Sequence, residues 1–293
     1  MNGCLVPGGT AGKVMRMSRE TLGLSLTSAV LSCCLLFANV ALSRSARAPQ
    51  AGGAIDPEKS SRPTPVLIEL FTSEGCSSCP PVDILLKKLD ASQPIPGAQL
   101  IVLSEHVTYW DQDGWKDPNS SSSLTQRQNS YEDALGETTP YTPQLIVDGT
   151  HVVRAGNAKQ IEDTLQKAAS IPKVPLRIGD VTVDAATPTL LRAHIETDAN
   201  FEKHSADVYV AVALDHVESQ VLRGENGGRH LIHVAVVQDI VKIGKLPKGQ
   251  PFAKDIQLKL KPGTDPRNIR LVAFVQEVGP GKVRGAAVRK PTL

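Results

Sequence analysis

Two cysteines, Cys76 and Cys79, carry the clearest chemistry in this sequence, and two serines separate them. A Cys-x-x-Cys spacing brings both sulfurs within one turn of chain, where they can form a disulfide or act as a dithiol. A strand-like apolar run precedes the pair and a helix-like run follows it, which places Cys76 at a helix N-terminus. Unpaired N–H groups and the helix dipole lower a thiol pKa there. We therefore expect Cys76 to be the nucleophile and Cys79 the resolving thiol, both open to substrate.

Other interpretations of the pair stay open. A zinc site needs four ligands and would have to recruit histidines such as His106. A copper carrier is a stronger alternative, because soft thiolates suit Cu(I) and His106 could complete the set. A purely structural disulfide is the third alternative, although so short a loop stabilises the fold only weakly.

The elements that position the cysteines follow from apolar periodicity. Strands are predicted at residues 66–71, 100–103, 144–147 and 152–153, with an Asp148-Gly149 turn between the last two. Helices are predicted over the apolar face from Val82 to Leu89, with Pro80 and Pro81 in the first turn, from a capping box at 123–126 to Gly136, and from Asn157 to Ala168. This β-α-β-α-β-β-α order is that of the thioredoxin fold, so we predict a thioredoxin-like domain at 65–172.

The chain after residue 172 has a different pattern of apolar and polar residues. Short alternating segments at 178–183, 190–195, 207–214, 256–260 and 269–275 are typical of antiparallel strands. The predicted fold class is therefore α/β, a thioredoxin-like domain followed by an antiparallel β-sandwich-like domain at 173–293. A total of 293 residues suits two domains.

Two features of the first domain would support the cysteines. Thr142-Pro143 precedes a predicted strand at the place where thioredoxin-like proteins carry a cis-proline, which would present the Thr142 backbone to an extended substrate. A plain trans turn is the alternative. Glu69 could be a buried acid that shuttles protons, or an ordinary strand carboxylate.

Two clusters are candidate substrate-binding regions. His106, Trp110 and Trp115 lie in an aromatic-rich insertion that could rim the Cys76 groove, or simply cap a core. The second cluster lies in a glycine-rich loop of the β-rich domain, and we expect it to dock near Cys76 or bind a ligand. Its members are Glu225, Asn226, Arg229 and His233.

The N-terminus predicts export. Three basic residues precede a long apolar run, so residues 1–48 read as a signal peptide and 49–64 as a flexible linker, although a retained anchor or lipidation at Cys33 is also conceivable. Removing 1–48 leaves a net charge of −2 and only Cys76 and Cys79. A near-neutral chain gives no reason to expect nucleic acid as a partner, and a membrane is expected only if the signal is retained.

Several motifs resemble a bacterial exported family catalogued as domain of unknown function 1223. They comprise residues 69–81, 106–111, 114–118, 127–128, 141–144, 147–149, 223–226, 228–229, 231 and 233, and His230 departs from the last motif. The resemblance implies a thioredoxin-like first domain and a periplasmic or secreted location; it implies no particular reaction. Gln238 stands where the family pattern leads us to expect a basic residue.

The predicted function is that of an exported thiol-disulfide oxidoreductase with a Cys76–Cys79 redox pair. Its partners would be a protein or small-molecule thiol or disulfide substrate and a redox recycling partner, and no cofactor is expected. The alternatives are a copper or other metal chaperone and a non-catalytic partner-binding protein on the same scaffold.

Overall fold

Two parallel strands, β1 (Thr64–Thr72) and β2 (Ala98–His106), lead to the region that carries both cysteines. The structure is a computed structural model that describes residues 62–137, 139–154, 156–184, 187, 189–198 and 205–292. The predicted signal segment and linker residues 49–61 lie outside these ranges. No helix within them is long and apolar enough to cross a membrane.

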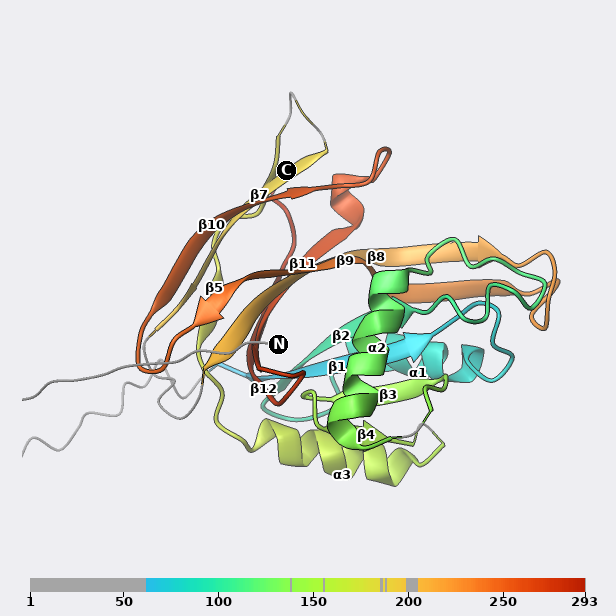
Figure 1. Cartoon of the computed structure of the whole chain (residues 1–293), viewed down its shortest axis with the longest axis horizontal. Helices are drawn as coiled ribbons and strands as arrows, with labels where there is room; N and C mark the ends of the chain where they lie inside the picture. Colours follow the sequence, from blue (N-terminus) through green and yellow to red (C-terminus); the bar gives the residue numbers. More distant parts are fainter. Residues whose placement is uncertain are drawn as a thin grey trace, which may run out of the picture. The chain divides into compact units, whose positions relative to one another are not determined.

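Eight strands form one mixed sheet in the order β12-β11-β8-β9-β2-β1-β3-β4 (Figure 1). Beside β1 lie β3 (Gln144–Val147), which is antiparallel to it, and β4 (His151–Val153). Beside β2 lie β9 (His230–Leu246), β8 (Ala206–Gln220), β11 (Ile269–Glu277) and β12 (Val283–Arg289). Strands from both sides of residue 172 thus share one sheet, whereas the sequence suggested two separate domains. A short parallel contact between Ser104 of β2 and Val236 of β9 joins them.

Three helices cover this sheet on two faces. α1 (Pro80–Ser92) and α3 (Ala158–Ala169) pack on one face, and α2 (Ser122–Leu135) on the other (Figure 1). Strand side chains alternate between faces, so Ile68 and Leu70 of β1 contribute to the α1–α3 core while Leu67 contributes to the opposite one. Asn157 caps α3 and Gly136 ends α2, as predicted. The predicted capping box at 123–126 is wrong, because Ser121 is the N-cap of α2.

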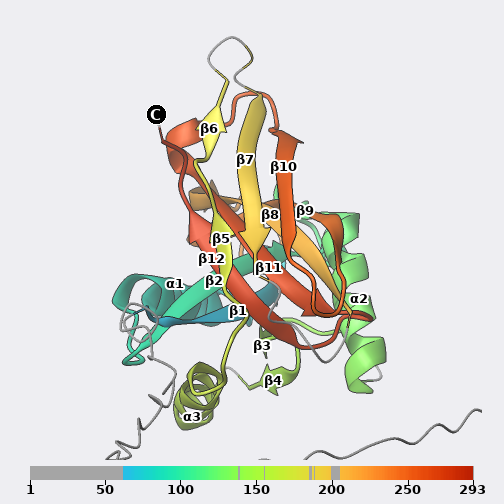
Figure 2. The same cartoon turned by 90° about the vertical axis from the view of Figure 1, so that its left-hand side faces the viewer.

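A smaller sheet packs on the far part of the large one. It contains β10 (Phe252–Lys259), β7 (Leu190–Thr197) and β5 (Leu176–Ile178), with β6 (Thr182–Val183) paired to β7 (Figure 2). The strand predicted at 178–183 is therefore divided into β5 and β6. Alternate residues of β8, such as Val208 and Val210, face this small sheet, while Ala211 and Ala213 face the other way. The molecule is thus mixed α/β with one large sheet and few helices.

Candidate functional site

Cys76 and Cys79 form a disulfide in the turn between β1 and α1, with their Cα atoms 5.4 Å apart. The helix begins after both cysteines, whereas the sequence placed Cys76 at its N-terminus. It starts at Pro80, and Cys79 is its N-cap. A helix that included Cys76 would need an N–H at Pro80, which proline lacks. The Val82 and Asp83 N–H groups both donate to the Cys79 carbonyl. The positive end of the α1 dipole still points at this turn, but Pro80 and Pro81 have no N–H group to direct at it.

The disulfide is not open to solvent, which contradicts the expected exposure. Both cysteines are 0% exposed, although Ser77 and Ser78 between them are exposed. The Cys76 Sγ lies 3.8 Å from the Thr142 carbonyl oxygen, and Trp110 Nε1 donates to the Thr142 hydroxyl at 2.7 Å. Segments remote in sequence therefore close over a turn that is itself at the surface.

The predicted cis bond is confirmed, because the Thr142–Pro143 peptide is cis. The Thr142 carbonyl faces the disulfide directly. The predicted roles of these two residues in substrate pairing stay predictions.

The loop at 221–229, between β8 and β9, holds the cysteine turn, and we call it the clasp loop. Asn226, which is fully buried, donates through Nδ2 to the Glu74 and Cys76 carbonyl oxygens, both at 2.9 Å. Glu225 accepts the Ser77 N–H at 3.1 Å. The expected docking of this loop near Cys76 is thus observed. Arg229 is exposed and bonds within the loop through its backbone, where its N–H donates to the Asn226 carbonyl oxygen.

Behind the disulfide lies a buried group of ionisable side chains, which we call the acid–histidine cluster. His106 Nδ1 is 2.6 Å from Asp117, and the His106 and His233 rings contact edge to face, with centroids 4.8 Å apart. His233 Nε2 lies 3.8 Å from Glu74 Oε1, and His233 Nδ1 lies 3.7 Å from Asp83 Oδ2. Each of these side chains is at most 4% exposed. His106, predicted at a groove rim, is therefore a core residue, because strand β2 turns it inward.

The charge state of the cluster follows from burial and pairing. Burial acts to lower the pKa of His106, but Asp117 outweighs it and raises that pKa. Burial acts to raise the pKa of Asp117, but His106 lowers it to about 2. Burial raises the pKa of Asp83 to about 7 and lowers the pKa of His233 to about 3. Asp117 is thus ionised beside His106, while His233 is neutral and Asp83 titrates near neutrality.

Four buried atoms of this cluster have no hydrogen-bond partner within the described ranges. They are Asp83 Oδ2, His106 Nε2 and both ring nitrogens of His233. Buried polar atoms are nearly always paired, so these are points where a ligand, a water or a mobile proton can bind. No group of three His, Cys, Asp or Glu side chains in the described part of the chain is arranged to hold a metal ion.

The two tryptophans flank the site from the insertion after β2. Trp115 Nε1 donates to Glu74 Oε2 at 2.8 Å, and Trp110 binds Thr142. Both rings are half-buried. They therefore connect the insertion to the cysteine turn and leave part of each ring accessible beside it.

Glu69 belongs to a different cluster. It accepts hydrogen bonds from Arg127 Nε at 2.7 Å and from the Tyr131 hydroxyl at 2.5 Å, both on α2. Its position in β1 turns it to the α2 face, away from the α1 side that Leu70 faces. Asp83, which lies one helical turn after Cys79, was not among the predicted site residues. The spacing of four from Cys79 was the signal that could have identified it.

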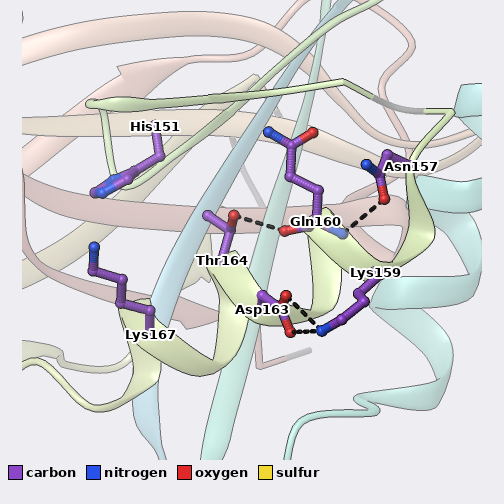
Figure 3. A pocket seen from close by; sticks show the side chains of 7 residues that line it. All are labelled: His151, Asn157, Lys159, Gln160, Asp163, Thr164 and Lys167. Carbon is purple, nitrogen blue, oxygen red and sulfur yellow. Dashed lines mark hydrogen bonds and ion pairs between the residues drawn. The ribbon is translucent and has the colours of Figure 1, made fainter.

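A polar pocket of about 360 Å³ lies on α3 and β4 and contains none of the predicted site residues (Figure 3). Asn157 caps the helix, Lys159 pairs with Asp163, and Thr164 bonds the Gln160 carbonyl. These contacts belong to the helix itself, so the pocket offers no convergent chemistry.

The site and fold define a mixed α/β protein with a clasped disulfide at a strand–helix junction. The chain belongs to the family described as protein of unknown function DUF1223, whose family model matches residues 67–276. No curated protein matches the chain.

One solved structure is similar to this chain over most of its fold. The crystal structure of protein AGR_C_4864 from Agrobacterium tumefaciens is 25% identical with a TM-score of 0.62, covering 79% of this chain and 96% of that one. A domain of the outer membrane lipoprotein Omp28 from Porphyromonas gingivalis is 15% identical with a TM-score of 0.27, covering 42% of this chain and 90% of that one. The second similarity is too weak to support an argument.

The clasp loop and the tryptophan insertion meet at Gly224 and Gly114, and a substitution at Gly224 tests this contact. Gly224 has a φ of +76°, and a Cβ there would lie 3.0 Å from the Asp113 carbonyl oxygen. We expect Gly224→Ala to lower the free energy of unfolding by about 1–2 kcal/mol and to speed reduction of the disulfide. Chemical denaturation and reduction kinetics measure the two effects.

Gly263→Ala is the matched control. Gly263 has a similar φ of +79°, but no atom of the described part of the chain lies within 4 Å of its added Cβ. Gly263→Ala should lower the free energy of unfolding through backbone strain but leave the rate of disulfide reduction unchanged. Equal reduction rates in the two variants would show that the loop contact does not protect the disulfide.

Proposed function

We propose that this protein is an exported thiol–disulfide exchange protein built on a thioredoxin-like fold extended by a β-sandwich-like part. The strand order β2-β1-β3-β4 supports the thioredoxin-like assignment, with β1 and β2 parallel, β3 antiparallel, and helices on both faces. The packing of the β5–β7–β10 sheet against β8 and β11 supports the sandwich assignment. The export signal predicted at 1–48 supports a periplasmic or secreted location.

The observation that carries the redox assignment is the disulfide at the N-terminal end of α1, with Cys76 Sγ facing the Thr142 carbonyl. A substrate thiolate attacks Cys76 Sγ, a mixed disulfide forms, and Cys79 leaves with the electron pair of the broken S–S bond. A second substrate thiolate then attacks the substrate sulfur of the mixed disulfide, which forms a substrate disulfide and releases the Cys76 thiolate. In the opposite direction, the Cys76 thiolate attacks a substrate disulfide and releases one substrate thiolate. The Cys79 thiolate then attacks Cys76 Sγ, re-forms the Cys76–Cys79 bond and releases the second substrate thiolate. Each full turnover exchanges two electrons and two protons between the cysteine pair and its substrate.

Asp83 is the group best placed to hold the proton of Cys79. It follows Cys79 by one helical turn, its N–H donates to the Cys79 carbonyl, and its pKa is raised by burial to about 7. A carboxyl that titrates near neutrality can accept a proton and return it at physiological pH. Thr72 donates to Asp83 Oδ1 at 2.9 Å and fixes its orientation.

The burial of both cysteines means that the clasp loop must open before a substrate reaches Cys76. The contact from Glu225 to Ser77 is fully exposed and therefore weak. The two buried bonds of Asn226 supply most of the closing free energy, about 1–3 kcal/mol together. A minor open state of roughly 1–15% follows from that range and is sufficient for slow exchange.

A trapping experiment tests this function. In Cys79→Ser, a mixed disulfide formed at Cys76 cannot be resolved, so incubation with an aromatic disulfide reagent should yield a stable one-to-one adduct. Cys76→Ser should form the adduct far more slowly, because Cys79 lies at the start of α1 beneath the turn. Equal labelling of the two variants would contradict the assigned roles.

A second candidate rests on the same burial. A disulfide with 0% exposure suits a non-catalytic binding protein in which the bridge only stiffens the turn. In that case neither single-serine variant forms an adduct in the folded state, and both label only when the chain unfolds.

A further inference from the structure

A groove of about 410 Å³ runs between α1 and the start of β9. Its walls are mainly apolar. Ile84, which is 53% exposed, Pro80 and Ala91 line it from α1, and Leu231 and Ile232 line it from β9. A volume of this size falls in the range of small-molecule sites.

Two members of the acid–histidine cluster, Asp83 and His233, also line this groove. They are 4% and 1% exposed, so they lie at its inner end. Asp83 Oδ2 and His233 Nδ1 are 3.7 Å apart, and neither has a hydrogen-bond partner among the residues that the structure describes. That separation is too long for a direct hydrogen bond, but one oxygen atom can lie at ~2.8 Å from both.

The chemistry of the groove selects its occupant. The acidic side chains of the cluster would repel a carboxylate. Lys87 and Lys88, which line the groove and are exposed, would repel a cation. A hydroxyl is neutral, and it can donate to one of the two inner atoms while it also accepts. The apolar walls then favour a hydrocarbon or aromatic body.

We propose that the groove between α1 and β9 binds a small neutral molecule with an apolar body and one hydroxyl group, the chemistry of a phenol or an alcohol. The hydroxyl lies between Asp83 and His233, and the apolar body lies against Ile84 and Leu231. This inference does not depend on the redox activity, because the groove is formed while the disulfide is closed.

The test compares para-cresol with para-xylene, in which a methyl group replaces the hydroxyl. Both are titrated into the oxidised, isotope-labelled full chain, and amide chemical shifts are followed. Para-cresol should shift the amides of α1 and of residues 230–233 saturably, and bind at least ~5-fold tighter than para-xylene, as one buried hydrogen bond implies. Equal affinities for para-cresol and para-xylene, or no saturable shift, would overturn the proposal. The groove would then hold only water.

Two tryptophan variants on α1 give the structural control. Ala91→Trp should fill the groove and abolish para-cresol binding, whereas Ser92→Trp changes an exposed neighbour that does not line the groove and should leave binding unchanged. Retained binding in Ala91→Trp would place the site elsewhere and reject the groove. The assay uses protein with both cysteines intact, so its result is separate from that of the trapping experiment.

Discussion

Replacing Asn226 with alanine is expected to raise the rate at which dithiothreitol reduces the Cys76–Cys79 disulfide by ~10-fold or more. The Asn226 amide is fully buried and bonds the Glu74 and Cys76 carbonyl oxygens, so its loss leaves both without this donor in the closed state. In the open state water can bond them instead. The closed state is thus destabilised relative to the open one, and the population of reactive disulfide rises.

The rate is measured by quenching the reaction at intervals and titrating the free thiols. Leu222→Ala is the control, because Leu222 lies in the same clasp loop but is 70% exposed. It should reduce at the wild-type rate. If Asn226→Ala also reduces at that rate while its thermal stability falls, the clasp loop does not control access to the disulfide.

Replacing Asp83 with asparagine is expected to stabilise the protein at pH 8 by ~2–4 kcal/mol and to have little effect at pH 4. Burial raises the pKa of Asp83 from 3.8 to about 7. Between these values the folded chain holds a proton that the unfolded chain has released, so the stability of the wild type falls as pH rises from 4 to 7. Asparagine does not titrate, and it can still accept the hydrogen bond from Thr72.

Urea denaturation at several pH values measures this difference. Asp83 also helps to raise the pKa of His106, so the difference between the two proteins includes this coupling. Asp133→Asn, at an exposed position on α2, is the control and should follow the wild-type profile. A parallel loss of stability with pH in wild type and Asp83→Asn would mean that Asp83 is not protonated in the folded state.

Asp83→Asn also distinguishes a role of Asp83 in stability from a role in disulfide exchange. If Asp83 takes the proton of Cys79, the asparagine variant should exchange disulfides more slowly at neutral pH although it is more stable. A destabilising charge that persists in a core is typical of a group retained for chemistry.

Local sequence patterns predicted the elements that hold the cysteines. The strand before the pair, the helix after it, the Asn157 cap and the Gly136 end each depend on neighbours within a few residues. Cys76 was placed at the N-terminus of α1, but Cys79 is the N-cap, because Pro80 has no N–H to donate to the Cys76 carbonyl oxygen. Strand β9 was not predicted, because the polar residues at its start read as a loop.

Burial of the site could not be predicted in the same way. The disulfide is covered by Trp110, Thr142 and Asn226, which come from three segments far apart in the chain. The acid–histidine cluster likewise combines α1, β2, β9 and two loops. No local periodicity reports such contacts, since they depend on how β9 meets β2 in the large sheet.

The most direct test of the redox assignment is the equilibrium of the Cys76–Cys79 pair with glutathione buffers, followed by thiol alkylation. A pair that exchanges with substrates should have a potential within about −120 to −270 mV, the range of catalytic dithiols. A value below about −300 mV, typical of structural disulfides, would contradict the account and favour a bridge that only stiffens the turn.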